Sequence, residues 1–142
     1  MSQAAGASAS DQAGSALQTS VAVMGLLRLG VAGWTVSRPR QAAIGLGVSE
    51  DQQEAAVPYV YALVARELML GLGALRAWRT GSGGALWMAA IAASDAFDAV
   101  VYQVLAELGT LDRTRARRAT LAALGGAVPE GITAVALVRH AR

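Results

Sequence analysis

Six ionisable residues lie near the middle of four long apolar stretches of the chain, where uncharged side chains would be the rule. They are Arg28 in the first stretch, Arg66 and Glu67 in the second, Asp95 and Asp98 in the third, and Glu130 in the fourth. A charge at the centre of a membrane-spanning helix costs about 2.5 to 3.5 kcal/mol, so it is retained where a partner or a chemical role offsets the cost. The residue types therefore predict one shared polar site.

The charges at this site do not balance, because two guanidinium groups face four carboxyl groups. An unpaired charge in a low-dielectric interior is strongly disfavoured. We therefore expect at least one carboxyl group to hold a proton near neutral pH, unless a cation supplies the missing charge. A neutral carboxylic acid in an apolar site is what a general acid requires.

Helical spacing places these residues on defined faces. Asp95 and Asp98 are three residues apart, Tyr102 is four residues further on, and Trp87 continues the same stripe on its N-terminal side. Tyr59 and Arg66 are seven residues apart and form a second stripe. The predicted catalytic residues are Asp95, Asp98, Glu67 and Glu130, and the predicted substrate-binding residues are Arg28, Arg66, Tyr59, Tyr102 and Trp87.

The elements that must position these side chains are four helices. The chain has 142 residues and is 54% hydrophobic, and its mean hydropathy of +0.41 is typical of a membrane protein. The apolar stretches cover residues 21–36, 57–78, 84–108 and 119–138. We predict an all-α, four-helix transmembrane bundle over residues 20–142, located in the cell membrane as a multi-pass protein, and a disordered polar tail over residues 1–19.

Composition argues against several classes of site. The chain has no cysteine, and its single histidine, His140, lies close to the C-terminal residue, so thiolate, haem and histidine-built zinc sites are not supported. The pair Asp95-x-x-Asp98 is similar to the Asp-rich motifs that hold magnesium-bound diphosphates, although such sites generally need more oxygen ligands. We expect no cofactor and no metal, with a divalent metal as the less favoured interpretation.

The positively charged residues do not indicate nucleic-acid binding. All twelve are arginine, the net charge is only +2, and the one dense cluster precedes the fourth apolar stretch. A duplex-binding protein would instead present a continuous basic face. The cluster suits anionic lipid headgroups better. We therefore expect membrane lipid and a small hydrophobic substrate as partners, no nucleic acid, and a possible homo-oligomer.

Several segments resemble a known group of proteins. These segments are Arg28-Leu29-Gly30, Pro39 leading into Ile44-Gly45-Leu46-Gly47, Ala65 to Leu72 with the pair Arg66-Glu67, and Ser94 to Ala99 with Asp95 and Asp98. Over residues 21–105 the chain resembles small four-helix membrane proteins of actinobacteria and fungi, which are loosely similar to DoxX-type proteins. The chain has Glu67 where that pattern has aspartate. The resemblance implies the four-helix architecture and leaves the activity open.

Three functions are compatible with buried charges of this kind. The favoured hypothesis is a cofactor-independent acid–base enzyme, an isomerase, cyclase or epoxide-opening enzyme, acting on a small polyketide- or terpenoid-like molecule. Asp95 or Asp98 would be the acid and Glu67 or Glu130 the base, while the arginines would hold a developing oxyanion or tune the carboxyl groups. The alternatives are a non-catalytic lipid-binding or accessory protein with structural ion pairs, and a carrier of protons or small ions.

Overall fold

The computed structural model describes the backbone of residues 2–141 and the side chains of residues 12–49 and 51–141. In this part of the chain every regular element is helical. The elements are α1 (Ser2–Ser37), α2 (Pro39–Gly45), the 3-10 turn η1 (Glu50–Gln52), α3 (Gln53–Thr80), α4 (Gly84–Glu107) and α5 (Arg113–His140). The prediction of an all-α chain is confirmed.

Helix α1 begins much earlier than the first apolar stretch. Its backbone is helical from Ser2, so it includes residues for which the composition predicts a disordered tail. These residues are rich in alanine, the strongest helix former, and contain no proline. A membrane-spanning helix that follows them can therefore propagate toward the N-terminus without burying apolar side chains.

The short helix α2 has no counterpart among the four apolar stretches. Pro39 occupies its first turn, where proline costs no hydrogen bond, so the residue that ends α1 also begins α2. Its Ala42 and Ala43 are buried against Val60 of α3. Gly47, with a φ of +88°, then allows the chain to turn toward α3.

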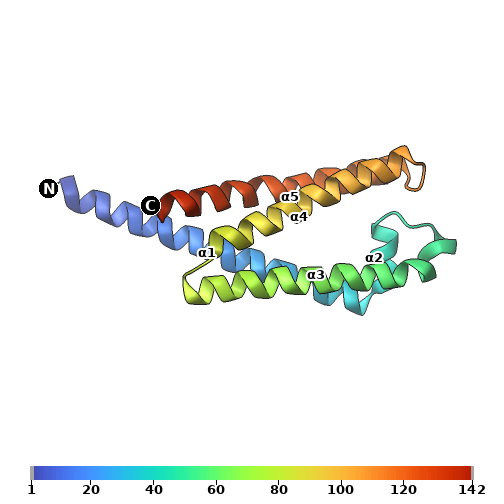
Figure 1. Cartoon of the computed structure of the whole chain (residues 1–142), viewed down its shortest axis with the longest axis horizontal. Coiled ribbons are helices and arrows are strands. Elements are labelled where there is room, and N and C mark those ends of the chain that lie inside the picture. Colours follow the sequence, from blue (N-terminus) through green and yellow to red (C-terminus); the bar gives the residue numbers. More distant parts are fainter. Residues whose placement is uncertain (1, 142) are drawn as a thin grey trace.

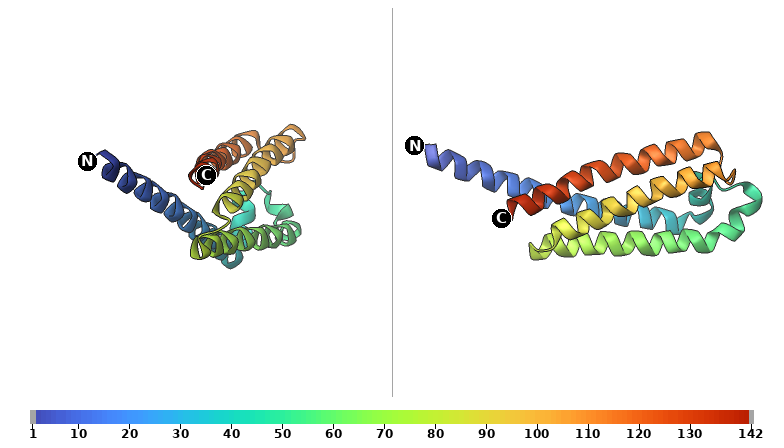
Figure 2. Two further views of the ribbon diagram at one scale, coloured as in Figure 1. Left: turned by 60° about the vertical axis from the view of Figure 1, so that its left-hand side comes forward. Right: turned by 45° about the horizontal axis from the view of Figure 1, so that its top comes forward.

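The helices pack as two antiparallel pairs, α1 with α3 and α4 with α5, and α4 diverges from α3 after the turn that joins the pairs (Figures 1 and 2). The first pair is close because two glycines face each other. A Cβ atom placed on Gly25 would lie 3.0 Å from the carbonyl oxygen of Gly71, and one placed on Gly71 would lie 2.9 Å from that of Gly25. Small residues of this kind let helix backbones approach within a membrane.

An apolar core joins the two pairs at one end of the bundle. Val21, Leu70 and Ile91 are fully or almost fully buried there with Met88 and Leu137. These residues come from the N-terminal half of the first span, the C-terminal half of α3, the start of α4 and the end of α5. The core therefore lies on one side of the mid-helix charges, and the opposite side is less densely filled.

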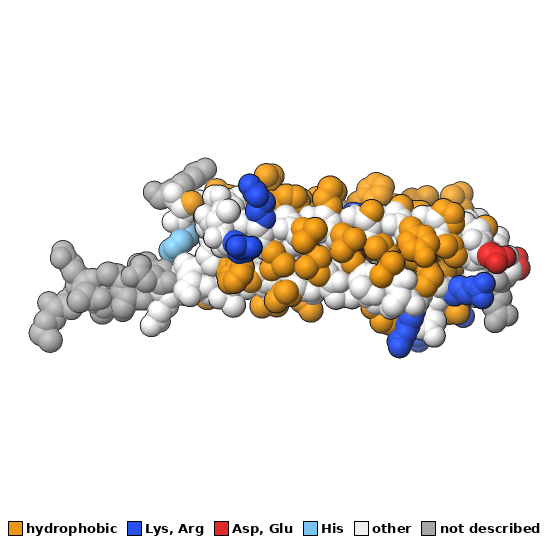
Figure 3. Space-filling model, turned by 90° about the horizontal axis from the view of Figure 1, so that it is seen from below, with side chains coloured by type: hydrophobic (Ala, Val, Ile, Leu, Met, Phe, Trp, Pro, Cys, Tyr) orange, Lys and Arg blue, Asp and Glu red, His pale blue; other side chains and the backbone are white. Residues whose placement is uncertain are grey.

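The outer surface of the bundle is apolar. Four helical segments are long and apolar enough to cross a membrane, Gln12–Ser37, α3, α4 and α5, and only 17% to 28% of the residues along their most apolar part are buried within the chain. Figure 3 shows one face on which hydrophobic side chains cover the middle and charged side chains lie toward the ends. This pattern is typical of a protein surrounded by lipid.

Candidate polar site

Arg28 joins all four membrane-spanning helices. From α1 its Nη1 donates to Glu67 Oε2 of α3 at 3.0 Å, while its Nη2 donates to Asp95 Oδ2 of α4 at 2.6 Å and to Glu130 Oε1 of α5 at 3.0 Å. The four side chains are between 2% and 12% exposed. Charge-assisted bonds of this length are stronger than neutral ones. One guanidinium group therefore links the two helix pairs.

Arg66 forms the second half of the network. Its Nη1 and Nη2 donate to the two carboxylate oxygens of Asp98 at 2.7 and 2.8 Å, and its Nε and Nη2 donate to Glu67 Oε1 at 3.1 and 2.8 Å. The pair with Asp98 is bidentate, which is the geometry that a guanidinium group favours with a carboxylate. Glu67 therefore bridges the two arginines.

The four acids differ in how many of their oxygens are bonded. Glu67 and Asp98 accept hydrogen bonds at both oxygens. Asp95 and Glu130 each accept at one oxygen, from the same Arg28 nitrogen. The other oxygen of Glu130, Oε2, is buried and has no hydrogen-bond partner among the described residues. Asp95 and Glu130 are thus the acids with capacity for a proton or a ligand.

A glycine makes room for this pair of acids. A Cβ atom on Gly126, one turn before Glu130 in α5, would lie 2.5 Å from Asp95 Oδ2. The neighbouring Gly125 has open space around its Cβ position. The absence of a side chain at Gly126 therefore lets the Asp95 carboxylate lie against α5 while it accepts from Arg28.

All six charged residues line one cavity of about 510 Å³. The cavity extends from the charged layer toward the end of the bundle that carries α2, and most of its wall is apolar. Trp34 and Tyr102 supply aromatic rings to the wall, and Leu46, the residue directly after α2, also lines it. A cavity of this size is within the range of small-molecule sites. Its polar groups are gathered at one end, and its apolar surface is suited to a hydrophobic molecule.

The cavity reaches the outside of the bundle beside α1. Leu27, Val31 and Trp34 line it and are also 56%, 50% and 46% exposed. Ala122 of α5 is likewise both a lining residue and exposed. Helix α1 contacts α3 extensively and α5 only sparsely, so the opening lies between α1 and α5. In a membrane this opening would face the lipid.

The structure places most, but not all, of the predicted site residues at the cavity. The four acids line it, as do Arg28, Arg66 and Tyr102. Tyr59 is exposed and lies outside the lining, and Trp87 packs against Gly73 and the apolar core. Trp34, and not the predicted Trp87, supplies a tryptophan side chain to the cavity wall.

The lining also includes residues that the sequence pattern does not assign to the site, among them Trp34, Thr35 and Gly126. Trp34 lies near the end of an apolar stretch, where an interfacial tryptophan is expected in any membrane protein. The spacing of seven residues between Arg28 and Thr35 places Thr35 near the charged face, although it gives Thr35 no role in the site. The role of Gly126 depends on the contact between α4 and α5, which the sequence does not give.

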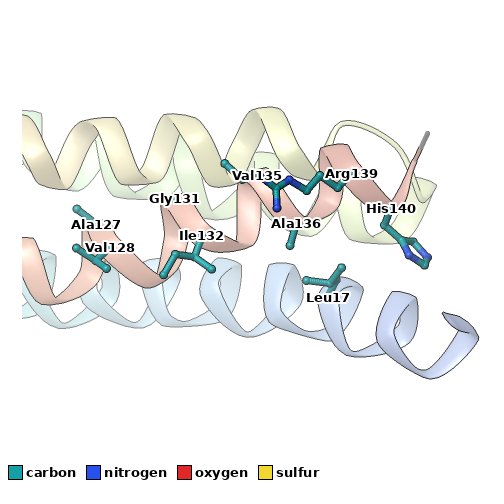
Figure 4. Close-up of a pocket in the computed structure, with 9 residues that line it drawn as sticks. All are labelled: Leu17, Ala127, Val128, Gly131, Ile132, Val135, Ala136, Arg139 and His140. Carbon is teal, nitrogen blue, oxygen red and sulfur yellow. The ribbon is translucent and has the colours of Figure 1, made fainter. Parts of the chain in front are cut away.

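A larger apolar groove of about 830 Å³ lies elsewhere, along α5 beside Leu17 of α1 (Figure 4). Its wall is formed by small and branched apolar side chains of α5, and Arg139 and His140 lie at one end. Among the described residues its lining contains no carboxyl group and shares no residue with the cavity of the polar site. It is therefore separate from the polar site.

The carboxyl groups of the polar site are directed at arginine. Within the described residues, no group of three or more histidine, cysteine or acidic side chains is arranged to hold a metal ion. Every bond made by the four acids in the network is to a guanidinium nitrogen. The donor set thus suits proton transfer and ion pairing.

Comparison with protein-family models, with curated proteins and with solved structures gives no match to this chain. The resemblance to the small four-helix membrane proteins stays a prediction. Inference about function therefore depends on the geometry of the polar site.

Proposed function

We propose that this chain is a multi-pass protein of the cell membrane that converts a small hydrophobic molecule, of polyketide or terpenoid type, by proton transfer without a cofactor. The observation that carries the proposal is the Glu130 carboxyl group. It is 2% exposed and Glu130 lines the cavity; one of its oxygens accepts from Arg28, and the other is buried and has no partner among the described residues. A carboxyl group in this setting is suited to hold a proton and deliver it to a ligand.

The bonding of the four acids supports a division of roles. Glu130 is the proposed acid and Asp95 the proposed base, because each keeps one oxygen free of the arginines. Glu67 and Asp98 are positioning residues, since the arginines occupy both of their oxygens. The arginine donors are directed at carboxylates, which favours a role in orienting and tuning the acids over a role in holding an oxyanion.

Opening of an epoxide illustrates the reaction. The O–H bond of the Glu130 carboxyl group breaks and its proton passes to the epoxide oxygen. The electron pair of one C–O bond goes to that oxygen, which leaves a positive charge on carbon. An internal hydroxyl group of the substrate then attacks this carbon and loses its proton to Asp95, or Asp95 removes a proton from the adjacent carbon to form a double bond. The proton then passes from Asp95 back to Glu130. The product is an isomer of the substrate, so no oxidant or reductant is required.

The proposal is tested with purified protein in lipid nanodiscs and a panel of terpenoid and polyketide epoxides. Products of unchanged mass are separated by chromatography. We expect Glu130→Gln to lower the rate by about 10²-fold or more, which is typical for loss of a general acid. The matched control is Glu107→Gln, which changes an exposed acid at the end of α4.

Two results would overturn this function. One is full conversion by a folded Glu130→Gln protein, and the other is the absence of conversion across the whole panel by wild-type protein. Folding of the variant is checked by helical circular dichroism and by a monodisperse elution profile. Asp95→Asn provides a second variant of the same site.

A further inference from the structure

The charge balance of the cavity points to the kind of molecule that it holds. Its lining includes four carboxyl groups and two guanidinium groups in the described part of the chain. With one proton on Glu130, three carboxylates still face two guanidinium groups, which leaves one formal negative charge. The cavity therefore contains both the protonated Glu130 and one carboxylate without a matching positive charge.

Among the described residues, no further basic side chain lines the cavity to balance this negative charge. Both Nη atoms of Arg28 and both Nη atoms of Arg66 are already bonded to carboxylates. Asp95, which also lines the cavity, accepts through one oxygen only, from the Arg28 nitrogen that it shares with Glu130. A buried carboxylate is costly unless a positive group pairs with it. The missing group is thus expected to come from the ligand.

The aromatic part of the wall is suited to the same positively charged group. Trp34 and Tyr102 line the cavity from α1 and α4, on the side away from the apolar core. The faces of tryptophan and tyrosine rings attract cations, most strongly where water is excluded. An organic cation could therefore place its charge between the carboxylates and the rings and its apolar groups against the remaining wall.

We propose that the ligand of this cavity is a small hydrophobic molecule that carries, or develops during reaction, a positive charge on carbon or nitrogen. This inference rests on the proposed function in that it names the substrate class of the same site. Among the reactions considered, it favours those with a cationic intermediate, namely epoxide opening and cyclisation, over an isomerisation that passes through an enolate.

The test compares two probes of equal shape and different charge, phenyltrimethylammonium and its neutral carbon isostere tert-butylbenzene. Binding to the full chain in nanodiscs of zwitterionic lipid is measured by calorimetry, with empty nanodiscs as the reference. We expect the cation to bind the protein about tenfold more tightly or better, because contacts with carboxylates and aromatic rings together exceed the 1.4 kcal/mol that a tenfold change requires. Equal binding, or tighter binding of the neutral probe, would overturn the inference.

Variants locate the cation within the protein. Asp95→Asn is expected to remove most of the preference, and Glu107→Gln is expected to keep it. A preference that survives in folded Asp95→Asn protein would place the cation elsewhere and overturn the inference. If a variant fails to fold, the comparison of the two probes in wild-type protein still decides whether the cavity prefers a cation.

Failure of this inference is distinguishable from failure of the proposed function. Conversion of neutral epoxides without any preference for the cationic probe would support the acid–base enzyme and contradict the inference of a cationic ligand. Selective binding of the cationic probe without conversion of any substrate would indicate a cation-binding membrane protein and contradict the proposed enzymatic function.

Discussion

Arg28 is the residue on which the polar site depends most, because its guanidinium group is bonded to carboxylates from three other helices. Removing one partner of a buried ion pair leaves the other charges uncompensated and typically costs about 3 to 5 kcal/mol. We expect Arg28→Gln to lower the free energy of unfolding by about this amount, measured by titration of the detergent-solubilised protein with a denaturing detergent.

The control for Arg28 is Arg40, whose pair with Glu54 is 3.7 Å long between side chains that are 72% and 90% exposed. Exposed pairs contribute roughly 0 to 1 kcal/mol, so Arg40→Gln should leave the free energy of unfolding nearly unchanged. Equal effects of the two substitutions would contradict the bonding pattern described for Arg28.

Gly126 gives a second prediction at the scale of one residue. A methyl group at this position would collide with the carboxylate of Asp95, a short side chain that Arg28 already holds. We expect Gly126→Ala to displace Asp95, to lower the free energy of unfolding by about 1 to 3 kcal/mol through overpacking, and to lower any conversion by the protein.

Gly125→Ala is the matched control, because it lies next to Gly126 in the same helix and has open space at its Cβ position. Replacing glycine by alanine within a helix should stabilise it by about 0.5 to 1 kcal/mol. If both substitutions stabilised the protein, the close approach of α5 to Asp95 would be wrong.

At the scale of the elements, the opening between α1 and α5 predicts the route of access to the cavity. The chain has no cysteine, so a single introduced cysteine can be labelled without interference. Val31 lines the cavity and is half exposed, whereas Val36 is similarly exposed on α1 and lies outside the lining.

We therefore expect that Val31→Cys labelled with a pyrene maleimide loses ligand binding and conversion, since the label fills the opening. Val36→Cys carrying the same label should keep both. Binding of phenyltrimethylammonium before and after labelling provides the measurement. Unchanged binding after complete labelling at residue 31 would show that ligands enter by another route.

The elements also show what could be predicted from the sequence and why. The spans and the grouping of the six charges follow from the cost of leaving a charge in lipid, which requires each charge to find partners inside the bundle. Which acid bonds to which arginine depends on the packing of the helix pairs, and the sequence carries no direct signal for it.

The sequence also could not predict helix α2, or which of two tryptophans lines the cavity, because both features depend on packing between helices. Pro39 predicts the end of α1 but gives no indication that seven residues then form another helix that packs on α3. Trp34 and Trp87 both lie near the ends of apolar stretches, and only the packing of Trp87 on Gly73 separates their roles.

At the scale of the whole molecule, the surface is more apolar than the interior near the charges. Large side chains such as Leu86, Phe97 and Ile132 are 71%, 66% and 65% exposed. Exposed apolar patches of this extent are not tolerated in water. We expect the protein to remain with membranes after a carbonate wash and to become monodisperse only in detergent or lipid nanodiscs. A monodisperse, helical protein in buffer alone would contradict the membrane assignment.

The links made by Arg28 have a consequence for the order in which the protein is assembled. During synthesis this arginine precedes Glu67 by 39 residues, Asp95 by 67 and Glu130 by 102. The first helix is therefore synthesised before any of these acids is available, and the last of them arrives only with α5. Until then the nascent chain holds an incompletely paired arginine, so we expect the insertion machinery or a temporary partner to shelter it, and a chain that stalls before α5 to be recognised and degraded.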